Sequence, residues 1–268
     1  MSRPERSHRL EQRYTNEAEA YKKLWAPVVE VPSRNLLCQL PLNDATCVVD
    51  IGTGVGTLLP HLQKMAPSAF VVGVDHAEGM LKWTPEGFFR VRADASQLSF
   101  LPNVFDVGVM MFMLFHLPDP VLGLLEMRSL LRKGGTVGIA TWGQDPGFPA
   151  YKVWIEELDR QGAEQLDPAN ELTQHHLVDT TEKVEALLVK AGYKSVKAWT
   201  GICNYQSRPE EFISRRTLFG LGKRRLDSLG LEDRNSCLRA LRSRLDKLDP
   251  QDFIMHKEVI FACAQKAS

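Results

Sequence analysis

The sequence predicts an α/β protein with a doubly wound, mostly parallel seven-stranded sheet and helical insertions. Three observations support this fold class. Short apolar runs alternate with segments of helical periodicity through the first half of the chain, as in a parallel sheet covered on both faces. A glycine-rich turn joins the first run to the first of these helices. Apolar runs then resume after a longer, more polar stretch, which indicates further strands separated by insertions.

The first forty residues read as irregular and then helical. Residues 1–13 are charged and turn-prone, and we expect them to be loose. Over 15–40 apolar residues recur at helical spacing, but Pro27 and Pro32 interrupt the stretch and predict two short helices. The recurring apolar residues are Tyr21, Leu24, Trp25 and Val28.

The next hundred residues alternate regularly. The predicted strands cover 47–51, 70–75, 88–92, 105–112 and 136–142, and the helices between them cover 57–66, 78–83 and 122–132. Pro60 must sit in the first turn of its helix, and the run 133–135, Lys-Gly-Gly, is typical of a helix stop. Parallel strands need such crossover helices, so this stretch predicts the central sheet.

A second block completes the sheet. A helix is expected over 181–191, capped by Thr180 or Thr181 and stopped by Gly192. Strands are expected over 196–202 and 259–264, with helical segments over 209–247 between them.

Composition excludes several classes of protein. Thirty-three basic and 33 acidic residues argue against a generic nucleic-acid or membrane-surface binder. The longest uncharged apolar stretch, 107–115, is far shorter than the roughly 18 residues that cross a bilayer. No apolar signal core follows the N-terminus, and five scattered cysteines without Cys-x-x-Cys spacing fit neither a disulfide framework nor a zinc ribbon. We expect a soluble, cytoplasmic protein without a metal site.

The glycine turn Gly52-Thr-Gly54-Val-Gly56 lets the backbone approach a ligand closely. It is not a dinucleotide fingerprint, because that spacing requires glycine where Thr57 stands. A phosphate loop is excluded too, since no lysine lies between 23 and 63. Asp75 ends the second strand, where a carboxylate can accept both hydroxyls of a ribose; its alternative role is a helix cap.

Four segments in order, 50–56, 73–81, 93–100 and 105–119, resemble the class I S-adenosylmethionine-dependent methyltransferases. Within that class the similarity is greatest to the group that includes the ubiquinone/menaquinone biosynthesis methyltransferases. It is strong over about 45–142, and looser over 188–196. The resemblance implies a Rossmann-like methyltransferase fold with S-adenosylmethionine as cofactor.

The resemblance also implies residue roles. Asp50 would order the glycine loop, Asp75 would bind the ribose, and Met80 would pack on the adenine. Asp94 would accept from the adenine amino group while the Ala95 N–H serves a ring nitrogen. Met80 as ordinary core and Asp94 as a turn residue stay open. The expected cofactor contacts are Tyr21, Asp50, Gly52, Thr53, Gly54, Asp75, His76, Met80, Asp94, Ala95 and Met111. Pro85 and Gly87 make the helix after Met80 shorter than is usual in the group.

The residues that would contact the methyl acceptor are less clearly indicated than the cofactor contacts. His116 follows the fourth strand and is the candidate general base, although it could simply shape its loop. One of His175 and His176 could face the acceptor. Tyr21 and Trp25 lie one helical turn apart, on a segment that closes over the cofactor in the resembling group; core packing is the alternative. The expected acceptor contacts are Trp25, His116, Trp142 and His176.

These expectations divide the chain into parts. They are an N-terminal helical lid (1–40), a cofactor-binding α/β core (41–145), an insertion shaping the acceptor pocket (146–180), a core helix and strand (181–205), a basic helical insertion (206–252) and the last core strand (253–268).

The sequence predicts methyl transfer to a small, partly apolar molecule at O, N or C by in-line displacement. An RNA-modifying methyltransferase is the first alternative, because 215–247 holds ten Lys/Arg and four acids. Only Phe219 is available there for base stacking, and residues 113–116 lack the Pro-Pro-aromatic turn of base-amino methylating enzymes. The second alternative is a catalytically silent S-adenosylmethionine-binding partner protein. The oligomeric state is left open.

Overall fold

A computed structural model describes residues 3–165 and 173–267. Its centre is a seven-stranded sheet in the order β3-β2-β1-β4-β5-β7-β6, with only β7 antiparallel to its neighbours. The predicted fold class is therefore confirmed. The strands are β1 (Cys47–Ile51), β2 (Phe70–Asp75), β3 (Phe89–Arg92), β4 (Phe105–Met111), β5 (Leu131–Trp142), β6 (Tyr193–Gln206) and β7 (Ile254–Lys266).

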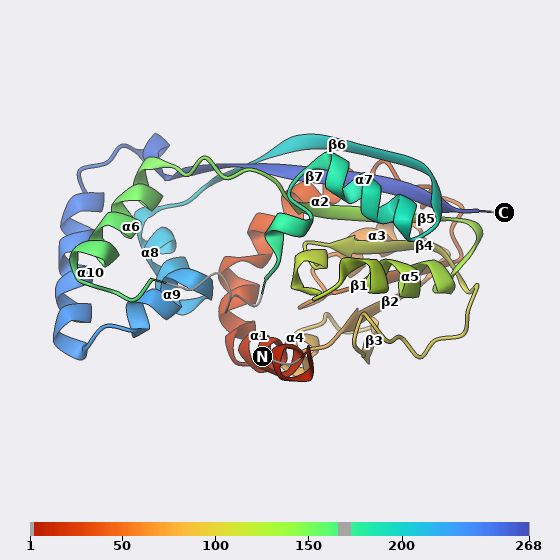
Figure 1. The fold of residues 1–268 in the computed structure, drawn as a ribbon, viewed down its shortest axis with the longest axis horizontal. Coiled ribbons are helices and arrows are strands. Elements are labelled where there is room, and N and C mark those ends of the chain that lie inside the picture. Colours follow the sequence, from red (N-terminus) through yellow and green to blue (C-terminus); the bar gives the residue numbers. More distant parts are fainter. Residues whose placement is uncertain (1–2, 166–172, 268) are drawn as a thin grey trace.

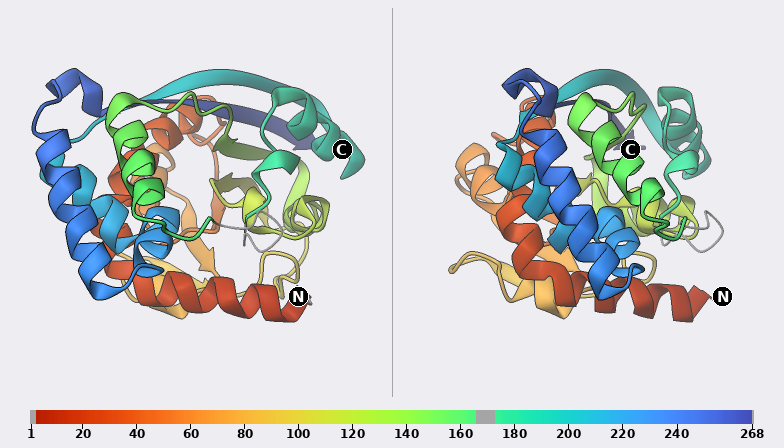
Figure 2. Two further views of the ribbon diagram at one scale, coloured as in Figure 1. Left: turned by 60° about the vertical axis from the view of Figure 1, so that its left-hand side comes forward. Right: turned by 90° about the vertical axis from the view of Figure 1, so that its left-hand side faces the viewer.

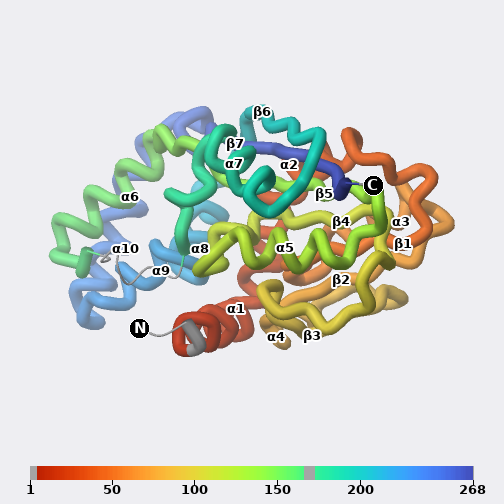
Figure 3. Tube along the Cα trace, turned by 45° about the vertical axis from the view of Figure 1, so that its right-hand side comes forward, coloured from red at the N-terminus to blue at the C-terminus, as the bar shows by residue number. Residues whose placement is uncertain are grey.

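Helices cover both faces of this sheet. α5 (Pro120–Leu130) and α7 (Thr181–Lys190) pack together on one face, and α2 (Ala26–Leu37) and α3 (Leu59–Met65) lie on the other (Figure 3). β1 and β4 are buried on both sides because their residues are apolar on both. Gly108 of β4 permits the contact with α5, since a Cβ there would stand 2.2 Å from the Met127 sulfur.

Four further helices build a cap beyond one end of the sheet. We use "the cap" for α6 (Pro149–Arg160), α8 (Pro209–Leu218), α9 (Gly220–Asp227) and α10 (Leu231–Leu245). Long extensions of β6 and β7 connect it to the sheet (Figure 1). The cap takes α6 from the predicted insertion 146–180, of which 166–172 lie outside the described residues, and its other helices from 206–252. The division into domains stays a prediction.

The N-terminal segment is the main departure from expectation. Residues 1–13 were expected to be loose, but α1 (Arg3–Leu24) begins at Arg3; residues 1 and 2 lie outside the described part. Figure 2 shows α1, in red, as a long helix running along one side of the molecule. It packs against α4 (Glu78–Leu81) and α8, so tertiary contacts stabilise a segment that is rich in charged residues.

Pro32 does not break its helix, contrary to expectation. Pro27 stands in the first turn of α2, whereas Pro32 lies inside it. A proline at 32 has no N–H for the carbonyl of Val28, and that carbonyl instead accepts from the Cys203 Sγ at 3.6 Å. The carbonyl that proline leaves free thus finds a partner on β6.

The ends of the other helices and strands differ less from the prediction. Pro60 lies in the first turn of α3, as predicted, and the Thr180 side chain caps α7 by accepting from the Lys183 N–H. α5 ends at Leu130, and the run 133–135 belongs to β5 rather than to a helix stop. Within the described residues, no helix combines the length and apolarity needed to cross a membrane.

Candidate active site

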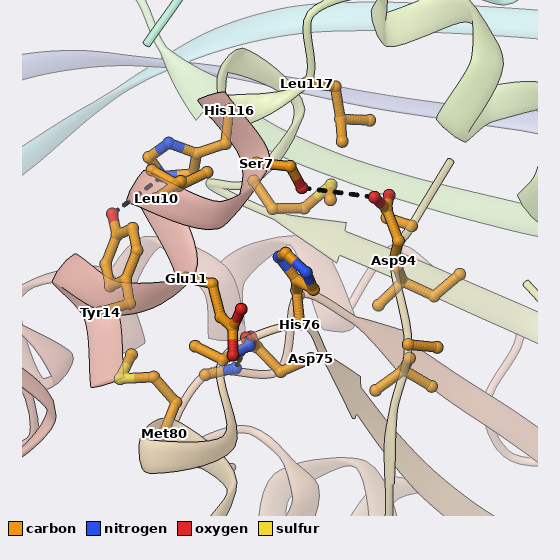
Figure 4. Close-up of a pocket in the computed structure, with 18 of the residues that line it drawn as sticks. Ser7, Leu10, Glu11, Tyr14, Asp75, His76, Met80, Asp94, His116 and Leu117 are labelled. Atoms are coloured by element: carbon orange, nitrogen blue, oxygen red, sulfur yellow. Dashed lines mark hydrogen bonds between the residues drawn. The ribbon is translucent and has the colours of Figure 1, made fainter. Parts of the chain in front are cut away.

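A cavity opens at the carboxyl ends of β1, β2 and β4, where α1 lies across it (Figure 4). It holds about 950 Å³ of space free of atoms, part of which is open to solvent. Its wall comes from the glycine turn after β1, from 74–77 and Met80, from 93–96 and from 111–113, and α1 closes it. Ligands of doubly wound sheets bind at this edge.

The glycine turn takes a backbone conformation that favours glycine. Gly52, Gly54 and Gly56 have φ values of 78°, 58° and 74°. A Cβ on Gly52 would stand 2.6 Å from the Met113 Cβ, so a side chain there would collide with the segment after β4. Gly52 and Gly54 therefore bring bare backbone to the cavity wall.

Asp75 ends β2 and faces the cavity. One carboxylate oxygen accepts from the Gly54 N–H at 2.8 Å and the other from the Ala77 N–H at 2.9 Å. Burial raises the pKa of Asp75, and these two backbone donors oppose that rise. Each oxygen keeps further acceptor capacity, so the carboxylate is both fixed in place and able to accept hydroxyl groups from a ligand.

The opposite wall carries Asp94 and Ala95 after β3. One Asp94 oxygen accepts from the Ser96 N–H at 2.8 Å and from its hydroxyl at 2.6 Å, and the other accepts from the Ser7 hydroxyl at 3.4 Å. Asp94 thus shapes its own turn, which was its alternative role, while it also lines the cavity. Met80 closes the side between them, with its Cε 3.3 Å from the position of a Cβ on Gly54.

α1 supplies a wall that sequence reasoning missed. Of the α1 residues lining the cavity only Tyr21 was predicted; the others are Arg6, Ser7, Leu10, Glu11 and Tyr14. Leu10, Tyr14, Ala18 and Tyr21 recur at helical spacing, a signal that could have extended the helix into the charged segment. Three contacts hold the helix over the cavity: Ser7 to Asp94, Glu11 to Arg92, and Thr15 to the Gly79 N–H.

His116 lies in the cavity wall, in the 3₁₀ turn Leu114–His116 after β4. Its Nε2 and the Tyr14 hydroxyl are 2.9 Å apart (Figure 4), and its buried Nδ1 has no partner among the described residues. Burial, with Arg13 next in effect, holds the pKa of His116 well below its usual range. The imidazole is therefore neutral at physiological pH, as a general base must be.

The segment before His116 is strained. Phe112 has a φ of 53°, unusual for a bulky residue, and its N–H donates to the Ala140 carbonyl at 2.7 Å. Met111, Phe112 and Met113 all line the cavity. This turn brings three consecutive apolar side chains to the cavity and leads into His116.

Several predicted residues lie outside the cavity wall. Asp50 is buried behind the glycine turn, and Thr53 faces Gly73, with its Cγ2 2.8 Å from the position of a Cβ there. Trp25 and Trp142 pack on each other, with ring centroids 6.2 Å apart. His176 is exposed. The other predicted cofactor residues, His76 and Met111 among them, do line the cavity. All of these roles stay predictions.

His175 lies closer to the site than His176. Its ring stacks on Phe115 with centroids 4.1 Å apart, and burial lowers its pKa to about 4. The sequence left the choice between the two histidines open, and the contact with Phe115 places His175 beside the turn that carries His116.

Comparison with known proteins points to one family. The family described as "Methyltransferase domain" matches residues 49–139. The malonyl-[acyl-carrier protein] O-methyltransferase of Geobacter sulfurreducens is 27% identical over 162 residues, which are 57% of each protein. The ubiquinone/menaquinone biosynthesis C-methyltransferase of Bdellovibrio bacteriovorus is 34% identical over 105 residues, 36% of this chain and 44% of that protein. The chain spans about half the length of these curated relatives.

A solved structure shows the same fold over most of the chain. The putative methyltransferase from an antibiotic biosynthesis pathway of Anabaena variabilis superposes with a TM-score of 0.62 at 15% identity, covering 86% of this chain and 96% of that one. The matched segment 49–139 contains the glycine turn, Asp75, Asp94 and His116. Residues 49–139 of this chain are therefore similar to the methyltransferase domain, over the segment that supplies the glycine turn, Asp75 and Asp94 to the cavity wall.

Proposed function

We propose that this protein transfers a methyl group from S-adenosylmethionine to a small, partly apolar acceptor. The observation that carries the proposal is the position of Asp75. Its buried carboxylate is fixed by two backbone N–H groups at the carboxyl edge of the sheet, inside a cavity walled by bare glycine backbone. An acid in this position suits the two hydroxyls of a ribose.

The remaining wall fits the rest of the cofactor. Gly52 and Gly54 bring backbone against the methionine part, Met80 packs on the adenine face, and Asp94 with Ala95 meets the adenine edge. Tyr21, His76 and Met111 complete the enclosure, while Asp50 and Thr53 support the turn from behind it. α1 covers the cavity and excludes water from the bound cofactor.

S-adenosylmethionine supplies a methyl group on a sulfonium, which leaves as a neutral thioether when a nucleophile attacks in line. Positioning by the cavity can therefore contribute much of the rate, on the order of 7–11 kcal/mol for well-oriented reactants. Where the acceptor must lose a proton, neutral His116 is the group in the wall that can take it. Tyr14, bonded to Nε2, sets the direction of that imidazole.

The acceptor enters between the core and the cap. Trp25 and Trp142 pack together there, and Trp142 also packs on Phe112 of the cavity wall at 4.3 Å between centroids. These rings suit an apolar body better than a polyanion. The exposed His176 has no contact that draws it to this place, and His175 is the histidine we assign to the acceptor side.

The RNA alternative receives less support. Within the described residues, at least five of the ten cations in 215–247 form ion pairs with nearby acids, so much of the segment's positive charge is not free to form one exposed basic face. These pairs are Arg215–Glu211, Lys223–Asp227, Arg225–Asp159, Arg234–Asp227 and Arg244 with Glu156 and Glu157.

The test is calorimetric titration with S-adenosylmethionine and S-adenosylhomocysteine. Asp75→Ala removes a carboxylate that would accept two ribose hydroxyls, and hydrogen bonds to a charged group contribute about 1.5–3 kcal/mol each. We expect micromolar binding by the wild type and a loss of roughly a hundredfold or more in the variant. A wild type that binds neither compound, or an Asp75→Ala protein that binds both unchanged, contradicts the proposal.

Asp246→Ala is the matched control, because Asp246 is an exposed acid at the end of α10, far from the cavity wall. It should bind both compounds like the wild type. Once binding is established, incubation with candidate acceptors and mass spectrometry of the products distinguishes an enzyme from a silent cofactor-binding partner.

A further inference from the structure

An aromatic cluster joins the cavity to the cap. Tyr14 and His116 line the cavity, and Phe219, between α8 and α9, packs on Tyr14 with centroids 6.2 Å apart. Trp25 stacks on Phe219 at 6.1 Å and contacts Trp142 at 6.2 Å. We call these five residues the aromatic cluster. It extends from the cavity toward the cap, on the side where the proposed acceptor enters.

Two cations beside the cluster are already neutralised. The Arg215 guanidinium lies 5.9 Å from the Trp25 ring and donates to Glu211 at 2.7 Å. Lys257 of β7 lies 5.0 Å from the Trp142 ring and pairs with Asp145 at 3.0 Å. Each of these charges has its own carboxylate within the protein.

Arg216 differs from both. Within 3–165 and 173–267, no acid lies at salt-bridge distance from its guanidinium, and its buried Nε has no hydrogen-bond partner. The guanidinium lies over the rings of Tyr151 and Phe212, at 4.5 and 5.5 Å. Burial lowers the pKa of Arg216 to about 10, and the charge of Asp145 opposes that effect only weakly. Asp145 is the carboxylate that Lys257 already holds.

A second guanidinium adds positive charge next to the aromatic cluster. Arg13 of α1 lies 4.9 Å from the Tyr14 ring, and its buried Nε also has no partner among the described residues. Together with Arg6 it is among the groups that lower the pKa of His116. Arg13 thus places a second guanidinium next to Tyr14 of the aromatic cluster, with Glu17 as the acid whose charge interacts with it.

Arg216 is half-buried and its Nε is buried without a partner, and a cation that has lost part of its hydration is costly unless a ligand supplies the missing charge. We propose that the methyl acceptor is an anion with a flat apolar body, whose anionic oxygen group binds Arg216 while its body packs on the aromatic cluster. The planar fork of a guanidinium suits a carboxylate or a phosphate equally. This inference rests on the proposed function, because it places the acceptor beside the cofactor cavity.

The experiment uses three probes that share one flat body: 2-naphthoate, 2-naphthyl phosphate and neutral 2-naphthamide. Each is titrated calorimetrically into the protein saturated with S-adenosylhomocysteine, and again into the free protein. We expect at least one of the two anions to bind ten times or more tighter than the amide. The stronger of the two identifies the anionic group as carboxylate or phosphate.

Arg216→Gln should reduce that preference to about one, and Arg216→Lys should keep part of it because the charge remains. Arg239→Gln is the matched control, since Arg239 is exposed on α10, and it should behave as the wild type. Thermal unfolding and S-adenosylhomocysteine binding, measured on every variant, show that the fold and the cofactor cavity are intact.

The outcomes separate the two proposals. Three results overturn the anion site while cofactor binding stands. They are equal affinity for the anions and the amide, no binding of either anion, and a preference for the anion that persists in Arg216→Gln. A preference for the anion that Arg216→Gln abolishes, in a protein that binds no S-adenosylhomocysteine, supports the anion site and contradicts the cofactor assignment.

Discussion

At the scale of single residues, the site depends on buried polar groups whose charge is set by their surroundings. Burial keeps His116 and His175 neutral, and it raises the pKa of Asp50 to about 7, an effect that the charge of Asp75 reinforces. Within 3–165 and 173–267, Arg216 has no acid at salt-bridge distance, although the charge of Asp145 acts on it. Such perturbed groups gather at functional sites more often than elsewhere, and here they surround one cavity and the cluster next to it.

The Asp50 carboxyl predicts a pH-dependent stability. Its folded pKa lies above its unfolded value, so the folded state prefers the protonated form and loses that preference as pH rises through about 7. Between pH 6 and 8 the wild type should lose roughly 1 kcal/mol of unfolding free energy relative to Asp50→Asn, which has nothing to ionise. Urea denaturation of both proteins across this range measures the difference, and a difference that does not change with pH would disprove the assignment.

At the scale of elements, α1 is held over the cavity by contacts from three of its turns. One of these contacts is with α4, where the Gly79 N–H donates to the Thr15 hydroxyl at 3.2 Å and the backbone of α1 lies close to Gly79. A Cβ on Gly79 would lie 2.6 Å from the Thr15 Cα and carbonyl oxygen. Since these are backbone atoms, a larger residue can be accommodated only if α1 moves.

Gly79→Ala should therefore loosen α1 without unfolding the sheet. Hydrogen exchange should become at least tenfold faster over 10–24, while β1, β4 and β5 keep their protection, because local opening needs no global unfolding. Gly230→Ala is the control: Gly230 precedes α10, and a Cβ there would meet only the Asp233 carboxylate at 3.9 Å. Unchanged exchange in α1 of the Gly79→Ala protein would show that this contact does not hold the helix.

At the scale of the whole molecule, positive and negative charges balance, and most of the cap's cations are used internally. Arg244 pairs with the almost fully buried Glu157, and Arg225 is itself buried against Asp159. These contacts join α10 and α9 to α6. At least five of the ten cations in 215–247 therefore pair with acids of the cap, so the net charge of +6 over this segment predicts little about a polyanionic partner.

We accordingly expect no retention of short single-stranded RNA by the intact protein at low ionic strength, as measured by fluorescence polarisation. Arg239 and Arg242 are exposed on α10 and offer the clean test, whereas Arg225→Ala would damage the cap. Salt-sensitive RNA binding that weakens at least tenfold in an Arg239→Ala, Arg242→Ala double variant would favour the RNA-modifying alternative.

Local patterns were enough to predict the central sheet and the part of the cavity that lies on it. β2 and β4 read as strands because 70–74 and 107–111 are uncharged, apolar runs, and the strand ends carry Asp75 at the end of β2 and Gly52 and Gly54 just after β1. The first half of α1, which covers the cavity, was not predicted in this way. Polar α1 is helical because it packs on α4 and α8, and Pro32 fits its helix because Cys203, 175 residues away from Val28, takes up the free carbonyl.

Two pairs of neighbouring residues on the acceptor side show what local patterns can and cannot predict. Arg216 and Arg215 are neighbours in the sequence, yet in the part of the chain that the structure describes only Arg215 pairs with a carboxylate. Likewise, the stacking of His175 on Phe115 separates it from His176. The pairing of Arg215 follows from its i, i+4 spacing to Glu211 on α8, whereas the stacking of His175 on Phe115 depends on packing between segments remote in sequence.

The place of β7 has a consequence for how the chain is made. β7 lies between β5 and β6, although it is synthesised after both. Until residues 254–266 leave the ribosome, β5 presents an unpaired edge and β6 has no neighbour in the sheet. The growing chain can complete its first five strands early, but it must then keep an open, apolar strand edge protected from other nascent chains until the last segment arrives.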